Sequence, residues 1–292
     1  DSCTISHHLI VCAQQNPIIL AARPGAAYPL VIIFIKRQTP ARILERPMMR
    51  TKLALSAAVY AAFLSPIFAS ASEDISISTS IDLVSDYVFR GVSLADTAIQ
   101  PGVEMAIGGF SAGAWFSTGI GGTSVFAGDE LDLYVGYDFA LSDKISAGVG
   151  GTYYHYPQGG SLFSTNGGGS GTYEISAGLG FDTVLAPSIT AYYDFTLEAF
   201  TLEGGLEHSV PLGDNTSFDL GLTAGLVDGD GFSYEYAQVS ASVGYSFTDD
   251  VSAYIGANFA LSSDETLNYS KILTTGGEDS LLFFGAGLAA GF

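Results

Sequence analysis

The stretch EDSLLFFGAGLAAGF, residues 278–292, decides which class of fold the chain adopts. Counting back by twos from Phe292, one face carries only apolar side chains: Ala290, Leu288, Ala286, Phe284 and Leu282. The opposite face is mostly Gly and Ala until Phe283 and Leu281, where both faces become apolar. A repeat of two residues predicts a β-strand rather than a helix. An apolar face behind a face of small residues is typical of a strand with lipid on one side and a lumen on the other.

The composition of the whole chain agrees with this interpretation. The 292 residues include 36 Gly, 19 Phe and 16 Tyr, and apolar types make up 48% of them. Gly together with aromatic and β-branched residues favours an all-β chain with many turns. The formal net charge of −20 argues against nucleic acid as a partner, because phosphates are bound by Lys and Arg.

A secretory signal peptide is predicted at residues 48–71, within MMRTKLALSAAVYAAFLSPIFASASED. Two basic residues, Arg50 and Lys52, precede an apolar core that is too short for a membrane-spanning helix. An A-x-A cleavage site at residues 69–71 follows, so we expect the mature chain to begin at Ser72.

The residues ahead of this signal, 1–47, are interpreted as translated upstream sequence, with a genuine cytoplasmic extension as the alternative. Both cysteines, Cys3 and Cys12, lie there, so the mature chain has no disulfide framework. From Ser72 onward the chain is strongly acidic, with only Arg90, Lys144 and Lys271 as basic residues.

Alternating polar and apolar residues recur through the mature part, residues 72–292, and predict twelve strands. We place them at 75–89, 98–107, 110–120, 130–141, 145–156, 172–182, 188–197, 200–210, 217–227, 235–247, 251–261 and 281–292. An even number lets the first and last strands close antiparallel. Short connections such as SDK alternate with long ones such as VDGDGFSYE, except near Glu198. The fold expected is therefore an all-β, transmembrane, antiparallel up-and-down barrel of about twelve strands, with a soluble sandwich as the alternative for any single strand.

A resemblance to a known family supports the barrel. The motif SDYVFRGVS at 85–93, followed by FSAGAWFST, ELDLYVGYDF, YYHYP and TYEISAGL, resembles the TorF-type porins of proteobacteria. The likeness is clearest over roughly 81–195. It implies an outer-membrane barrel of Gram-negative bacteria and names no solute.

The inward-facing phase of the predicted strands carries nearly all of the strand charge. With twelve strands about 4.8 Å apart, the barrel is roughly 24 Å wide, and small inward side chains would leave a water-filled lumen about 8–12 Å across. We expect Arg90 to pair with Asp86 or a neighbour at the outer end. The predicted pore-lining residues are Asp82, Asp86, Arg90, Glu104, Glu130, Asp132, Asp138, Glu174, Asp194, Glu203, Glu207 and Asp219. They indicate a cation-favouring pore, or alternatively carboxylates that only solvate the lumen wall.

Two other motifs contain residues that could carry chemistry. The run Tyr153-Tyr154-His155-Tyr156 is typical of an interfacial aromatic girdle, and a rim hydrolase using His155 beside Ser170 is the alternative. DGDG at 228–231 lacks the spaced ligands of a calcium loop and fits a hairpin turn. No metal or cofactor site and no catalytic residue is predicted.

The sequence thus predicts an outer-membrane porin-like channel for passive diffusion of small solutes, cationic or neutral, rather than an enzyme. Its expected partners are outer-membrane lipid and the outer-membrane insertion machinery, which would read Phe292 as an assembly signal. The loop from Pro157 to Gly171 is the candidate constriction. The alternative is a barrel that transports nothing and binds a surface partner through its loops.

Overall fold

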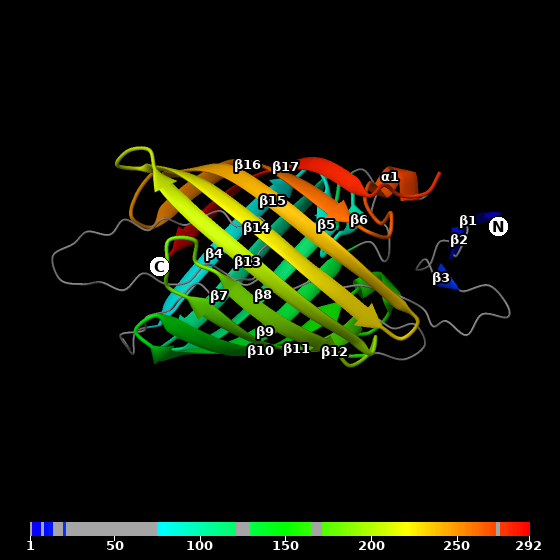
Figure 1. Cartoon of the computed structure of the whole chain (residues 1–292), viewed down its shortest axis with the longest axis horizontal. Coiled ribbons are helices and arrows are strands. Elements are labelled where there is room, and N and C mark those ends of the chain that lie inside the picture. Colours follow the sequence, from blue (N-terminus) through cyan, green and yellow to red (C-terminus); the bar gives the residue numbers. More distant parts are fainter. Residues whose placement is uncertain are drawn as a thin grey trace.

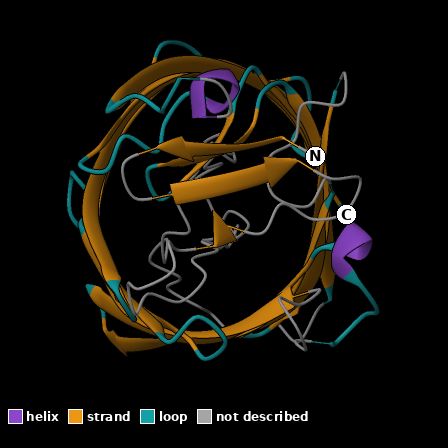
Figure 2. Ribbon diagram, turned by 90° about the vertical axis from the view of Figure 1, so that its right-hand side faces the viewer, coloured by secondary structure: helices purple, strands orange, loops and turns teal. Residues whose placement is uncertain are grey.

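The computed structural model describes residues 2–6, 9–13, 20–21, 75–120, 129–164, 171–272 and 275–292. Twelve strands form one closed antiparallel barrel (Figures 1 and 2). They are β4 (Ser76–Val84), β7 (Ala98–Ile107), β8 (Phe110–Gly119), β9 (Glu130–Ser142), β10 (Ile145–His155), β11 (Gly171–Phe181), β12 (Ser188–Asp194), β13 (Ala199–Pro211), β14 (Thr216–Gly229), β15 (Phe232–Ser246), β16 (Val251–Ser262) and β17 (Ser280–Gly291). The predicted fold class and strand number are confirmed.

Three kinds of smaller element accompany the barrel. β1 (Ser2–Ser6), β2 (Leu9–Ala13) and β3 (Leu20–Ala21) form a separate sheet, whereas the predicted signal peptide at 48–71 lies outside the described residues. β5 (Tyr87–Phe89) and β6 (Val92–Ala95) pair as a hairpin, and the helical pieces are η1 (Pro157–Gly159) and α1 (Tyr269–Ile272). In the part of the chain that the structure describes, no helix is long and apolar enough to cross a membrane.

The barrel closes between its last and first strands. β17 pairs with β4 from Gly285↔Val84 to Gly291↔Ser78, and Ile77 and Phe292 exchange backbone hydrogen bonds of 3.1 and 2.8 Å. Both ends of the barrel segment therefore lie at one end of the barrel. We call this the turn end, because the short connections 108–109, 143–144, 182–187, 212–215 and 247–250 gather there.

The opposite end, the loop end, holds the connections 85–97, 195–198 and 230–231 and the described parts of three others: residues 120 and 129, residues 156–164, and residues 263–272 with 275–279. The expected long loop VDGDGFSYE is wrong, because β14 and β15 continue through most of it as paired strands. Asp230 and Gly231 alone make the turn, and Gly231 has φ +84°. A two-residue turn with positive φ suits the twist of a hairpin, so DGDG is a hairpin turn as predicted.

The outward and inward faces of the strands differ as the alternation predicts. On β11, Tyr173, Ile175 and Leu179 are exposed, whereas Glu174 and Ser176 on the other face are buried. Exposed apolar side chains continue around the barrel, including Ile81, Val103, Val135, Leu222, Ile255, Phe284 and Leu288. Leaving each in water forgoes about 1.5–3 kcal/mol of burial, and a continuous band of this kind fits contact with lipid.

The first predicted strand, 75–89, is correct as far as Val84 and wrong in its last five residues, 85–89. β4 ends at Val84, the chain bends at residues 85–86, and residues 87–95 turn back as the β5–β6 hairpin. Tyr87, Val88 and Phe89 are all buried, so this segment has no exposed face to offer lipid. Three successive apolar residues fit a segment enclosed on both faces rather than a wall strand.

Candidate pore and its plug

The lumen wall carries the carboxylates that the alternation assigns to it. All but two of the predicted pore-lining residues lie on the inward-facing phase of wall strands: Asp82, Glu104, Glu130, Asp132, Asp138, Glu174, Asp194, Glu203, Glu207 and Asp219. The exceptions are Asp86 and Arg90, which belong to the first long connection. That these residues line a conducting pore stays a prediction.

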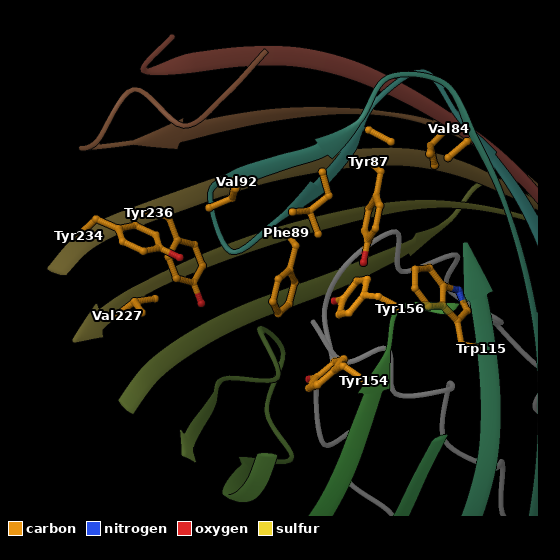
Figure 3. Close-up of a cluster of buried hydrophobic side chains, with 13 residues drawn as sticks. Val84, Tyr87, Phe89, Val92, Trp115, Tyr154, Tyr156, Val227, Tyr234 and Tyr236 are labelled. Carbon is orange, nitrogen blue, oxygen red and sulfur yellow. The ribbon is translucent and has the colours of Figure 1, made fainter. Parts of the chain in front are cut away.

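The hairpin of residues 87–95, hereafter the plug hairpin, occupies the loop-end half of the lumen. Its side chains join a buried apolar cluster with wall residues from β8, β10, β14 and β15 (Figure 3). The Tyr87 ring meets the Trp115 ring edge-on, with centroids 5.5 Å apart. A second cluster joins Val88 to Phe283 on β17 and to Leu267 in the last loop. The expected water-filled lumen is therefore wrong for this half, because the plug hairpin packs there.

The last long loop holds the plug hairpin from its other side. The backbone N–H of Ser93 donates to the carbonyl of Thr266 at 2.9 Å, and the N–H of Asn268 donates to Ser93 Oγ at 3.0 Å. The hydroxyl of Thr266 donates to the carbonyl of Gly91. Wall and loop contacts together keep the hairpin docked.

Arg90 stands at the tip of the plug hairpin, with φ +44°. Its Nη1 and Nη2 donate to Glu174 Oε2 and Oε1 at 2.8 and 3.3 Å, a bidentate pair with side chains 6% and 4% exposed. The expected pairing with Asp86 is wrong. Asp86 instead accepts a hydrogen bond from Ser85 Oγ at 2.9 Å, and burial raises its pKa. The hairpin carries Arg90 inward, toward a strand that is distant in sequence.

Aromatic rings complete the surroundings of the guanidinium. Its Cζ lies 4.0 Å from the centroid of Tyr192 and 4.6 Å from that of Phe89. The Tyr154 hydroxyl donates to Glu174 Oε1 at 3.0 Å. Rings near a cation add attraction to the ion pair, and the phenol bond holds the carboxylate in place.

A second carboxylate lies beside this one. Glu203 on β13 accepts hydrogen bonds from the hydroxyls of Tyr192 and Tyr236. We call the wall residues around Arg90 the guanidinium site: Tyr154, Glu174, Tyr192, Glu203 and Tyr236. They come from β10, β11, β12, β13 and β15, so the site exists only once the barrel has formed.

A third acidic group lies near the loop end of β9. Glu130 accepts hydrogen bonds of 2.9 Å from Tyr87 on the plug hairpin and from Tyr156 after β10. Asp132, two residues along the same face, is 1% exposed. Among the described residues, its neighbour is the carboxyl group of Glu130, and no hydroxyl, amide or guanidinium donor reaches its oxygens.

The predicted aromatic girdle at 153–156 is divided between the two faces. Tyr154 and Tyr156 point into the lumen, where they bond Glu174 and Glu130. Tyr153 and His155 are on the outward phase, with rings 5.9 Å apart. The girdle prediction thus fails for the two inward residues, because alternation cannot place neighbours on one face.

The expected constriction by the loop from Pro157 does not hold for its described part, which reaches Ser164. The Phe163 ring lies 4.9 Å from outward-facing Tyr153, and the Tyr173 hydroxyl donates to the Phe163 carbonyl at 3.2 Å. This segment lies against the outside of the wall. Ser170, the serine considered beside His155, is outside the described residues.

The turn-end half of the lumen differs in character. Glu104, Asp138 and Glu207 are only partly buried there, and many of the inward residues around them are Gly and Ser. Asp219 accepts hydrogen bonds from Ser209 and Ser217 at 2.5 and 2.7 Å. A wall of small residues with partly exposed carboxylates can take up water and cations.

Sequence reasoning missed the tyrosines of the guanidinium site and the plug hairpin. One signal was available: alternation stops at YVF, residues 87–89, just before the Arg-Gly pair. The inward tyrosines at 154, 192 and 236 also stand out among small inward neighbours. Their partners lie on other strands, and alternation gives no information about distances across the lumen.

One family profile matches part of the chain. The profile of a family described as a bacterial protein of unknown function (Gcw_chp) matches residues 68–197, a range that includes the plug hairpin and both Arg90 and Glu174. No curated protein matches the sequence.

Solved structures similar to the barrel include two porins and a channel. They are the NanC porin (14% identity, 74% of this chain and 99% of that chain, TM-score 0.45), the KdgM porin (10%, 74% and 99%, TM-score 0.48) and an outer membrane channel from Pseudomonas putida F1 (10%, 75% and 94%, TM-score 0.42). At these identities the similarity concerns the fold alone.

Proposed function

We propose that this chain is an outer-membrane channel for small solutes that the plug hairpin holds closed, with a preference for cations. The observation that carries the proposal is the division of the barrel into an apolar outer band and an inward face of Gly, Ser, Thr and carboxylates. A polar interior is typical of barrels that contain a water path. On this proposal the chain is exported by the signal at 48–71 and is a TorF-type porin of a Gram-negative bacterium.

Opening would require the plug hairpin to leave the loop-end half of the lumen. The strands on either side do not depend on it, since Val84 pairs directly with Ala98 and a short turn could join β4 to β7. The decisive experiment replaces residues 86–96 by such a turn and measures conductance in a planar bilayer. We expect rare openings for the native chain and steady conductance for the plug-free variant.

Folding of each variant is checked by the heat-shifted gel band of an intact barrel. The matched control shortens the segment 157–164, which lies outside the wall and should leave conductance unchanged. A plug-free variant that folds but never conducts would overturn the channel.

Cation preference is tested in the plug-free background by the reversal potential in a KCl gradient. Three of the carboxylates that face the lumen are Asp132, Asp138 and Glu174. Changing them to Asn, Asn and Gln should shift the reversal potential toward that of a nonselective pore. Carboxylates around a wet lumen concentrate cations, and the effect fades as salt rises from about 0.01 M to 1 M because the Debye length falls from about 30 Å to 3 Å. A preference for chloride, or one unmoved by these changes, would refute this part.

The filled loop-end half favours a second candidate, a barrel that transports nothing and binds a surface partner through its loops. The same experiment separates the two, because this candidate requires a plug-free barrel that folds without conducting. We propose no enzyme activity, since the His155 ring lies on the outward phase beside Tyr153, away from the lumen carboxylates.

A further inference from the structure

We infer that the guanidinium site is a binding site for small solutes bearing a guanidinium group, and that Arg90 occupies it in place of such a solute. The inference rests on the proposed channel, through which the solute would reach the site. It names the class of solute that the channel would bind. It also makes Arg90 of the plug hairpin a competitor of that solute for the guanidinium site.

The acidic and phenolic groups of the site belong to the wall. Glu174 and Glu203 would stay in place, with their tyrosine donors, if the plug hairpin moved away. The cation would leave with Arg90, the only basic side chain in the lumen among the described residues; Lys144 and Lys271 are exposed in connections. With Arg90 gone, the two carboxylates Glu174 and Glu203 keep their place on the wall without a basic neighbour, so the emptied site would favour another cation.

The geometry favours a guanidinium over other cations. Two parallel hydrogen bonds reach the two oxygens of Glu174, and the Tyr192 ring lies 4.0 Å from the guanidinium carbon. A planar guanidinium can make both contacts at once, whereas an ammonium or an alkali ion acts as a point charge. The Tyr154 hydroxyl donates to Glu174 and the Tyr236 hydroxyl donates to Glu203. Each carboxylate has further lone pairs, which can accept hydrogen bonds from the ligand.

A second observation points to a ligand with more than one positive group. Asp132 sits directly opposite Tyr154 in the β9–β10 register, beside the site, and is 1% exposed. Among the described residues, no hydroxyl, amide or guanidinium donor reaches either of its oxygens, and its polar neighbour is another acidic group, Glu130. Buried carboxylates normally have donors, so a second cationic group on the ligand would supply what Asp132 lacks. Agmatine, with a guanidinium and an ammonium, should therefore bind better than arginine, whose carboxylate would meet these acidic groups.

The test uses the purified, folded barrel with Arg90→Ala and measures binding of methylguanidinium and agmatine by calorimetry. We expect this variant to bind methylguanidinium at least tenfold more tightly than the native chain, whose site is occupied. Agmatine should bind more tightly still. Adding Glu174→Gln should weaken both by about tenfold or more, because a charge-assisted bidentate contact is lost. Lys144→Ala, a charge change in an exposed turn, should bind like the native chain.

Equal binding by Arg90→Ala and the native chain, or by Arg90→Ala with and without Glu174→Gln, overturns the inference. If Arg90→Ala does not fold, the plug-free variant provides the same comparison with an intact wall. Conductance is a separate readout: a plug-free barrel that conducts but does not bind methylguanidinium refutes only this site. One that binds but does not conduct refutes the channel.

Discussion

The Arg90–Glu174 pair gives the sharpest prediction about closure. Arg90→Met keeps much of the side-chain volume at the hairpin tip but removes the charge and both hydrogen bonds to Glu174. Because the two side chains are 6% and 4% exposed, the pair is buried in the docked state. In the undocked state Glu174 would regain contact with water, so the substitution should penalise the docked state selectively.

The size of the effect follows from the burial. Removing one partner of a buried pair costs about 3–5 kcal/mol. Taking the lower figure, since the side chains retain slight exposure, and about 1.4 kcal/mol for each tenfold change, the ratio of open to closed barrels should rise about a hundredfold. Glu174→Gln alone should raise it less, because an amide can still accept hydrogen bonds from Arg90.

Single-channel open probability in a planar bilayer measures this ratio. The double variant Arg90→Met with Glu174→Gln should open less than the product of the two single effects, because the two residues interact. Lys144→Met removes one charge from an exposed turn and serves as the control. An open probability for Arg90→Met within twofold of the native value would refute the idea that this pair holds the plug hairpin.

Three further outcomes are expected. Tyr87→Phe should raise open probability about tenfold or more, because it removes a hydrogen bond from the plug hairpin to a buried carboxylate, whereas Tyr156→Phe removes a bond within the wall to the same group and should do less. Gly91→Ala should undock the hairpin, since its Cβ would lie 2.6 Å from a wall side chain, while Gly108→Ala, also at positive φ but with nothing within 4 Å, should leave gating unchanged in the same recordings. Phe292→Ser should lower the amount of heat-shifted, folded barrel in membranes if the last strand is an assembly signal; unchanged assembly would contradict that role.

The barrel could be predicted from the sequence because the alternation of apolar and polar residues that specifies it can be read within each strand separately. Lipid on one side and water on the other impose a period of two, which residues 284–292 display. The bounds expected for 98–107 coincide with those of β7. Errors occurred where the local rule no longer applies, as at 228–229 and 232–234, where β14 and β15 stay paired beyond the predicted strand ends. A strand can continue in water as long as its backbone is paired, so polarity alone did not mark its end.

The plug hairpin could not be predicted in the same way, because both of its faces are buried against protein and no alternation of lipid-facing and water-facing residues marks it. Residues 87–89 have the length and composition of a strand, and alternation from β4 runs into them without a proline or a long polar gap. Only the loss of a polar phase indicates that neither side meets lipid or open water. That signal covers three residues, and a short apolar run is equally common in buried strands of other folds.

Arg90 shows where sequence reasoning stops and why. A lone cation among many carboxylates must be paired when it is buried, and the expectation of an ion pair was sound. The sequence predicts Asp86 or a neighbour as the partner, because proximity in sequence is the only measure of distance it offers. The closed barrel places Glu174, which is 84 residues away in sequence, next to the tip of the plug hairpin. Closure of the barrel therefore decides which carboxylate Arg90 meets, and the same closure assembles the tyrosines around it. A site built from five strands is a property of the closed sheet, so its chemistry becomes visible only when the strand order and register are known.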